Sequence, residues 1–403
     1  MKEHNEDNKR GLNNMDFSLF KSVSRGLLFC AVALPMLVGS SCKKDDSSDP
    51  VPDDDPKDPA VQIKHKHDIY LAVSYDSIYA GGVRSRSYAG YYHNGQIHKL
   101  EGQSTNVDCY ANAIFVDGND VYVCGREGDL AVYWKNDEIV YLPGGVHATS
   151  ICVKNGNVYV SGYEVPDIYS ADKACCWINN NKTSLDMGTR ATCITADAQG
   201  HVYIGGYYLD RTTYLSSARF WTDAESNNIE RNSLNSQYSS EVWAIALDET
   251  HQTNGHAYIC MGGHESTPQA HNINKQWVNR KATDLCVANG NMVNGIVAYN
   301  GKLYTCGNDM KIAKYWSTTI AKNGEGQDLM TMQLSDGRSQ CYATGIDVEE
   351  GDVYVVGYEP NNQMDQKATV WKNGTKFLSI PAAVRVTPNG IDVVSTTELV
   401  TAE

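Results

Sequence analysis

Positive charge is scarce in this chain of 403 residues, which has 34 lysines and arginines against 48 aspartates and glutamates and a formal net charge of -14. Proteins that bind nucleic acid need a positive surface to neutralise phosphates, so this balance argues against a nucleic-acid partner. It also disfavours direct binding to anionic lipid. Any attachment to a membrane therefore has to come from a separate anchor.

Several other signals are missing. No stretch shows a sustained helical period, so we expect almost no helix. No nucleophile elbow, phosphate-binding loop or catalytic dyad stands apart from the rest of the sequence. No cysteine spacing matches a zinc site. The common hydrolase and nucleotide-binding mechanisms thus lack support, and we expect neither a cofactor nor a metal.

What the sequence does contain is a repeat. A short apolar run centred on a tyrosine recurs seven times between residues 78 and 358, each followed after one to three residues by glycine. Successive copies lie 37 to 55 residues apart, a spacing typical of arrays and propellers, in which each unit buries its apolar face against its neighbours. The seven tyrosines are Tyr79, Tyr122, Tyr159, Tyr203, Tyr258, Tyr304 and Tyr354.

Three more elements accompany the tyrosine run in each unit. An aromatic follows it, at Tyr92, Trp134, Trp177, Trp221, Trp277, Trp316 and Trp371. A small or polar pair and an isoleucine precede most copies, ending at Ile114, Ile151, Ile194, Ile245, Ile296 and Ile346. The last element ends on Leu100, Leu142, Leu185, Leu234, Leu285, Leu334 and Ile380. Four short strands per unit predict an all-β fold, a single seven-bladed β-propeller of four-stranded antiparallel blades.

Residue size assigns the strands to places within a blade. Small residues such as Ala113, Ser150, Gly295 and Gly345 suit the innermost strand, where seven sheets converge. The tyrosines and tryptophans belong to the middle strands, where adjacent blades press together. We interpret these rings as blade packing rather than as a binding platform.

Closure of the ring needs both ends of the chain. Residues Asn389 to Val393 form another inner strand, whereas the first unit offers only an atypical inner candidate, Ile69 to Val73. We expect the C-terminal strand to complete the N-terminal blade, which removes exposed sheet edges. A ring of eight blades with a composite blade is the alternative. Residues 61–403 are then one domain, and we expect a monomer.

The N-terminal region predicts export. Lys21 and Arg25 precede an apolar run from Leu27 to Val38, too short to span a membrane but right for a secretory signal. Small residues then lead into Cys42, which resembles the lipobox of bacterial lipoproteins, although Gly39 replaces the usual leucine. The resemblance implies a signal peptide over residues 1–41 and a lipid on Cys42; ordinary secretion is the alternative. Translation starting at Met15 would give a more compact signal.

Residues 42–60 are acidic and rich in proline and serine, so they predict a solvated tether. The lysine and aspartate run directly after Cys42 resembles the export signal of Bacteroidota surface lipoproteins. That resemblance implies an outer-membrane protein, lipid-anchored and facing the cell exterior.

Ten cysteines lie within the propeller region, and most replace Val, Ser or Gly at repeat positions. We interpret them as small buried hydrophobes, with a few disulfides as the alternative. Four histidines, His251, His256, His264 and His271, fall close together in the fifth unit. Without a ligand spacing beside them we expect loop histidines rather than a metal site.

Loops after the tyrosine runs leave equivalent strands, so they should gather on one face, where recognition residues usually lie. A rim of tyrosine, glutamate and histidine there suits a sugar or a peptide. The candidate ligand residues are Tyr163, Glu164, Tyr207, Tyr208, His264, Glu265, Tyr358 and Glu359.

The repeat as a whole, with runs such as Ile114-Phe115-Val116 and Val121-Tyr122-Val123, resembles uncharacterised propeller lipoproteins of Bacteroidota and is loosely kelch-like. We expect a non-enzymatic binding module for an extracellular glycan or protein. One alternative is a propeller glycosidase or lyase with its acid and base among Glu164, Asp167, Glu265 and Glu359; another is a structural adhesive scaffold. The sequence leaves the ligand open.

Overall fold

The computed structural model describes residues 61–78, 84–166, 170–223, 230–234, 238–267, 272–286, 292–360, 366–380 and 385–401. The predicted signal peptide, Cys42 and the tether lie outside these residues, as do Tyr79, Asp167 and His271. Within the described ranges every regular element is a strand, so none of them contains a helix that could cross a membrane.

The strands form seven four-stranded antiparallel sheets, which we number as blades 1 to 7. Blade 1 joins β28 (Val386–Thr401) to β1 (Val61–Ile78), β2 (Arg84–His93) and β3 (Gln96–Leu100). The other blades each use four consecutive strands: blade 2, β4 (Cys109–Asp117), β5 (Asp120–Glu127), β6 (Leu130–Lys135) and β7 (Glu138–Tyr141); blade 3, β8 (His147–Lys154), β9 (Asn157–Glu164), β10 (Lys173–Ile178) and β11 (Asn181–Ser184); blade 4, β12 (Arg190–Ala196), β13 (Val202–Leu209), β14 (Ser216–Thr222) and β15 (Glu230–Ser233); blade 5, β16 (Ser240–Thr253), β17 (His256–Glu265), β18 (Ile273–Val278) and β19 (Lys281–Cys286); blade 6, β20 (Met292–Tyr299), β21 (Lys302–Asp309), β22 (Ile312–Ile320) and β23 (Gly326–Gln333); blade 7, β24 (Tyr342–Glu349), β25 (Asp352–Pro360), β26 (Gln366–Lys372) and β27 (Thr375–Ser379).

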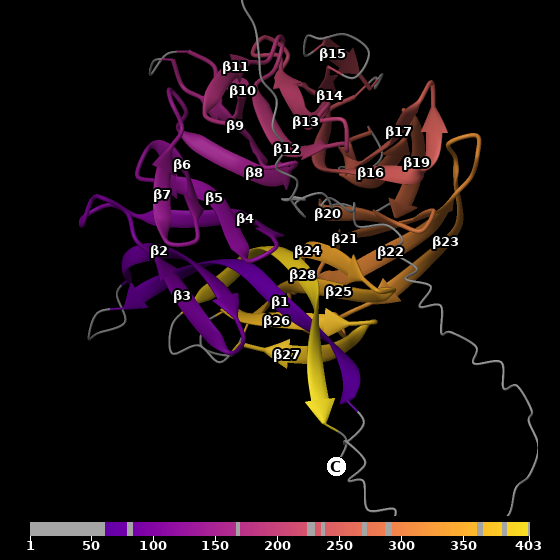
Figure 1. Cartoon of the computed structure of the whole chain (residues 1–403). Coiled ribbons are helices and arrows are strands. Elements are labelled where there is room, and N and C mark those ends of the chain that lie inside the picture. Colours follow the sequence, from indigo (N-terminus) through magenta and orange to yellow (C-terminus); the bar gives the residue numbers. More distant parts are fainter. Residues whose placement is uncertain are drawn as a thin grey trace, which may run out of the picture. The chain divides into compact units, whose positions relative to one another are not determined.

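The first strand of each sheet is innermost. Strands β28, β4, β8, β12, β16, β20 and β24 contact one another in that order and return to β28, which closes the ring (Figure 1). The predicted seven-bladed propeller is confirmed. All innermost strands run the same way, so the ring has a rim face, where they begin and the second strands end, and a hairpin face, where the first and second strands are joined.

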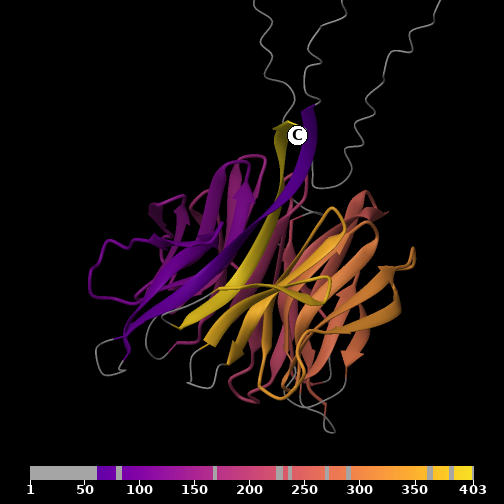
Figure 2. The same ribbon diagram turned by 90° about the horizontal axis from the view of Figure 1, so that it is seen from below.

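Closure by the C-terminal strand is confirmed, with one correction. Strand β28 is the innermost strand of blade 1, and β1, which contains the predicted inner segment Ile69 to Val73, is the second strand. Leu71 lies opposite Tyr92 in β2, as Val123 lies opposite Trp134 in blade 2. Tyr70 therefore occupies the position equivalent to Tyr122 that the sequence analysis gave to Tyr79. The pairing of β1 with β28 continues beyond the blade as a two-stranded ribbon (Figure 2).

The aromatic residues of the middle strands pack between blades, as predicted. Trp177, for example, lies in a core cluster with Tyr122, Cys124 and Tyr133 of the preceding blade. A ring of this size buries about 150–250 Å², worth roughly 4–6 kcal/mol on transfer scales. The indole N–H groups of Trp134, Trp177 and Trp221 each donate to a carbonyl just past the last leucine of the preceding blade, at 2.9, 3.0 and 2.9 Å. The ten cysteines of the propeller are free and nine are buried, which confirms their interpretation as small hydrophobes.

A belt of hydrogen bonds links the innermost strands. Each of them carries a β-bulge that adds one residue, and in six of the seven blades the side chain of this residue donates to the next blade. Thr149 of blade 3, for example, donates to the Ala191 carbonyl of blade 4 at 2.7 Å. The other belt donors are Asn112, Thr192, Asn294, Thr344 and Asn389. The seventh bulge residue is Trp243 in blade 5, whose indole N–H donates to Glu241 of its own blade instead, at 3.1 Å.

Candidate binding site on the rim face

The eight predicted ligand residues all lie near the ends of second strands, in β9, β13, β17 and β25. Because these strands are equivalent and parallel to one another around the ring, their ends share the rim face. Adjacent residues of a strand point to opposite sides of the sheet. The four predicted pairs are thus split, with Tyr163, Tyr207, His264 and Tyr358 on one side of their blades and their successors on the other.

The three predicted glutamates are held by lysines of their own blades. Glu164 pairs with Lys182 at 2.6 Å, Glu265 with Lys275 at 2.8 Å and Glu359 with Lys376 at 2.5 Å. Ion pairs that solvent still reaches stabilise a fold by at most about 1 kcal/mol. Their effect here is to neutralise each carboxylate and direct it toward the outer strands. Tyr208 lies on the side of β13 opposite to Tyr207 and is half-buried.

A fourth carboxylate, Glu127, occupies the same strand position and was missed. It is buried and accepts hydrogen bonds from the Ser104 backbone N–H at 2.6 Å and from the Tyr141 hydroxyl. Burial, followed by the bond to Glu127, raises the pKa of Tyr141 to about 12. These residues border a depression of about 690 Å³ that is also lined by Val107, Asp129 and Leu130, among others. The spacing glycine-x-glutamate, shared with the other three sites, could have identified Glu127.

Tyr163, Tyr207, His264 and Tyr358, which share one side of their blades, contact side chains at the beginnings of the innermost strands. His147 stacks on Tyr163 with ring centroids 5.3 Å apart, and the Arg190 guanidinium also lies over the Tyr163 ring, 4.5 Å from its centroid. Arg190 is the cross-strand partner of Tyr207 and forms an ion pair with Asp172 at 2.7 Å. Blades 3 and 4 are thereby linked.

The contacts continue into blade 5. The Tyr207 ring lies 6.1 Å from the ring of Trp243, whose N–H binds Glu241, and Glu241 lies 3.8 Å from His264. We call the connected residues the rim cluster: His147, Tyr163, Arg190, Tyr207, Glu241, Trp243 and His264. Of the predicted residues, it brings together Tyr163, Tyr207 and His264. Tyr358 belongs elsewhere, in blade 7, stacked on Tyr342 with centroids 4.7 Å apart.

Burial sets the charge of the rim cluster. It lowers the pKa of His147 to about 4, with further contributions from Arg126 and Arg190. Burial also lowers the pKa of His264, against the opposing effect of Glu241. Both imidazoles are therefore neutral at pH 7. The remaining cation is Arg190, whose side chain is 41% exposed. The cluster thus presents aromatic rings and a guanidinium beside a single carboxylate.

Four members of the rim cluster were not predicted, namely His147, Arg190, Glu241 and Trp243. Trp243 carried a signal, since it is the one tryptophan of seven outside the recurring third-strand position. The other three lie two residues before a bulge residue. That position becomes recognisable only once the bulged register of the innermost strands is known.

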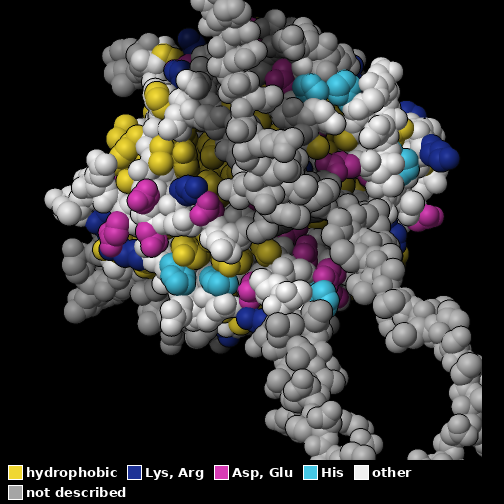
Figure 3. All heavy atoms as spheres, viewed as in Figure 1, with side chains coloured by type: hydrophobic (Ala, Val, Ile, Leu, Met, Phe, Trp, Pro, Cys, Tyr) yellow, Lys and Arg dark blue, Asp and Glu magenta, His cyan; other side chains and the backbone are white. Residues whose placement is uncertain are grey.

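The expectation of loop histidines in the fifth unit is wrong for the three that the structure describes, because His251 lies in β16 and His256 and His264 lie in β17. His264 lies at the rim-face end of β17, whereas His256 begins the same strand at the hairpin face. His251 pairs with Asp248 at 2.6 Å, and His271 lies outside the described residues. Figure 3 views the ring from the hairpin face, where histidine and carboxylate side chains lie over several blades. Among the described residues, one group of three potential metal ligands occurs there: Asp197, His201 and His256.

Comparisons with known proteins identify no family for the chain. No family model matches the chain, and no curated protein matches its sequence. Similar solved structures include the β-propeller domain of the Trilobed protease from Pyrococcus furiosus, at 9% identity and a TM-score of 0.49, covering 80% of this chain and 95% of that one. The propeller domain of Cps50 (Swd1) from Myceliophteria thermophila shows 10% identity, a TM-score of 0.47 and coverage of 69% and 90%. The periplasmic gluconolactonase PpgL from Pseudomonas aeruginosa shows 9% identity, a TM-score of 0.43 and coverage of 80% and 99%.

Proposed function

We propose that this propeller is a non-enzymatic binding module and that its partner, an extracellular glycan or protein, contacts the rim cluster. The observation that carries the proposal is the unbroken series of contacts from His147 to His264, which spans blades 3 to 5 on one face. Tryptophan, tyrosine and arginine are the residues most enriched in binding hot spots. A protein partner fits this composition best, and a glycan is the other outcome of the test below.

Binding is favoured over hydrolysis by the state of the carboxylates. Glycoside hydrolysis commonly needs two carboxyl groups that face each other about 5–9.5 Å apart, one of them protonated. The three predicted glutamates lie in three different blades, and each forms an ion pair with a lysine of its own blade. Trp243 is half-buried and is the one bulge residue that does not donate to the next blade. A purely structural scaffold would not need a tryptophan at this position.

The predicted lipid anchor suits this use of the rim face. The ribbon of β1 and β28 leaves the ring on the hairpin face, and the chain enters the described fold at its tip, at Val61 (Figure 2). A lipid on Cys42 would hold the protein by this end and leave the rim face toward the cell exterior. Changing Cys42 to Ala should then release the protein from the membrane fraction. A variant that stays with the membrane would contradict the anchor without bearing on the rim cluster.

The binding proposal is tested by retention and turnover measured together. The purified protein is passed over panels of immobilised glycans and extracellular proteins, and eluates are examined for products. We expect retention without products, lost in Trp243→Ala and kept in Tyr214→Ala, a matched aromatic change at a side chain that is 79% exposed and outside the rim cluster. Product formation that ceases in a Glu164, Glu265 or Glu359 variant would overturn the non-enzymatic assignment.

A further inference from the structure

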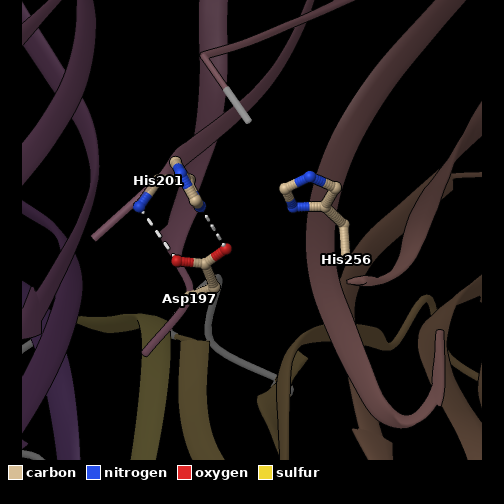
Figure 4. A group of neighbouring side chains, drawn as sticks. All are labelled: Asp197, His201 and His256. Atoms are coloured by element: carbon tan, nitrogen blue, oxygen red, sulfur yellow. Dashed lines mark hydrogen bonds and ion pairs between the residues drawn. The ribbon is translucent and has the colours of Figure 1, made fainter. Parts of the chain in front are cut away.

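On the hairpin face, three side chains from two blades converge (Figure 4). Asp197 follows β12 and His201 precedes β13, so both lie in the turn of blade 4, whereas His256 is the first residue of β17 in blade 5. One potential ligand atom from each lies within 4.8 Å of the other two. The group is at the opposite face from the rim cluster, so it is independent of the proposed function.

Asp197 orients one of the imidazoles. It is 4% exposed, and one carboxylate oxygen accepts backbone N–H groups of Gln199 and His201 at 3.0 and 2.9 Å. The other oxygen lies 3.0 Å from His201 Nδ1 and 3.0 Å from the Tyr203 hydroxyl. Asp197 Oδ2 and His201 Nδ1 are thus already about as far apart as two ligands of one tetrahedral metal ion.

His256 provides the second imidazole. Its ring meets that of His201 edge-on, with centroids 5.4 Å apart at an interplanar angle of 72°. Both histidines are half-buried, so solvent reaches the space beside them. Figure 4 shows the His256 ring facing the Asp197–His201 pair across this space.

Blade 5 has a similar aspartate-histidine pair, and the comparison shows what distinguishes a potential metal site from an ordinary turn. Asp248 and His251 form the corresponding pair in that blade, with the carboxylate 2.6 Å from Nδ1. His251 stacks on Tyr258 at 5.5 Å, and the described residues provide no third ligand there. The aspartate-histidine pair alone is thus a way of closing a turn. The addition of His256 is what distinguishes blade 4.

We propose that Asp197, His201 and His256 bind one divalent transition-metal ion, with Zn²⁺ the best match, and so join blades 4 and 5 at the hairpin face. Two imidazoles and a carboxylate are a ligand set that Zn²⁺ accepts, with water completing the tetrahedron. Zn–N bonds of about 2.0–2.1 Å bring tetrahedral ligands to about 3.3 Å from one another. The His256 side chain, at the start of its strand, makes this movement by rotation.

The test uses titration calorimetry of the full chain with Zn²⁺, together with thermal unfolding in Zn²⁺ and in EDTA. We expect one Zn²⁺ per chain in the micromolar range and a higher unfolding temperature with Zn²⁺ than with EDTA. His256→Ala should weaken binding at least tenfold and remove the temperature shift, and Asp197→Asn, which removes the carboxylate ligand, should weaken binding by at least as much. The control, His251→Ala, should bind like the parent.

Two results would overturn the site. One is the absence of micromolar Zn²⁺ binding in the parent chain, and the other is equal binding by the parent and His256→Ala. His256→Gln, with its unfolding temperature measured in EDTA, checks that a loss of binding does not come from misfolding, because His256 is half-buried and its replacement leaves the turn of blade 4 intact.

Discussion

Two interfaces between neighbouring blades, which we call seams, differ in the polarity of the side chains that they bury. Between blades 2 and 3, Ala131 and Tyr133 of β6 pack on Trp177 within an apolar cluster. Between blades 5 and 6, the equivalent positions of β18 hold Asn274 and Gln276, both buried. These seams differ although the same repeat generates both. The difference shows that blade 5 departs from a pattern that the other blades keep.

The polar seam carries hydrogen-bonding atoms without partners among the described residues. They are Asn274 Oδ1, Gln276 Oε1, Thr305 Oγ1 and Trp316 Nε1. Leaving a buried group of this kind unsatisfied costs about 1–3 kcal/mol. Blade 5 also places Trp243 where the other blades have a belt donor. Sequences violate local rules mainly where function requires it. Asn274, Gln276 and Trp243 depart from the repeat in blade 5, which also supplies Glu241 and His264, and Thr305 and Trp316 face them from blade 6.

The largest expected effect comes from removing a tryptophan from each seam. Trp177→Ala should destabilise the protein by about 3–5 kcal/mol, because it opens a cavity and leaves the Pro143 carbonyl unpaired. Trp316→Ala should cost roughly 1 kcal/mol less, since its indole N–H has no partner among the described residues. Urea unfolding of both variants measures the difference. Equal losses would remove the distinction between the seams.

A reciprocal exchange sharpens the comparison. Val160 and Thr305 occupy equivalent positions, opposite Trp177 and Trp316, and both are buried. Thr305→Val should stabilise the protein by about 1 kcal/mol by removing an unpaired hydroxyl, whereas Val160→Thr should cost about 1–2 kcal/mol by introducing one. The two shapes are nearly identical, so the free energies of unfolding isolate the hydroxyl. Effects of the same sign would contradict our account.

The belt allows a third test. Thr149→Val removes the bond to the Ala191 carbonyl and should cost about 1 kcal/mol. Trp243→Asn introduces a belt donor in blade 5 and should gain about 0.5–1 kcal/mol while abolishing partner binding. Thermal unfolding measures the stabilities, and retention on the partner measures the binding. A Trp243→Asn variant that loses stability and keeps binding would mean that the tryptophan is structural.

The smallest effect concerns pH. The folded-state pKa of His147, about 4, lies below its ordinary value of 6.5, so the unfolded chain binds more protons between these values. Stability from this residue is complete above pH 6.5 and declines as the pH falls toward 4, by about 0.5–1 kcal/mol between pH 7 and pH 6. His147→Gln should flatten the unfolding temperature over this interval, relative to the parent. An unchanged slope would place the pKa of His147 near its ordinary value.

Much of the fold was predictable because the repeat is local. Each tyrosine run and each third-strand tryptophan identified a blade, and Asn389 to Val393 identified the closing strand. Tyr79 was chosen over Tyr70 because blade 1 takes its innermost strand from the far end of the chain. No local pattern shows that β1 is the second strand of its blade rather than the innermost one.

The site was less predictable, for two reasons. Ligand residues were chosen by sequence proximity, but a strand rises about 3.3 Å per residue, so His256 and His264 lie about 26 Å apart at opposite faces. Conversely, Trp243 and Tyr207 meet because neighbouring blades bring them together. The partners of Glu164 and Glu359, which are lysines of the outer strands, likewise follow from register rather than from composition.

The most direct test of the central claim, that blade 5 departs from the repeat in order to bind a partner, is photo-crosslinking on intact cells. A benzophenone amino acid is placed at position 243 or, as the control, at position 214, and the adducts are identified by mass spectrometry after irradiation. We predict an adduct of discrete mass from position 243 that is absent from position 214 and is lost when Arg190→Ala is added. No adduct at position 243, or the same adducts from both positions, would contradict the claim.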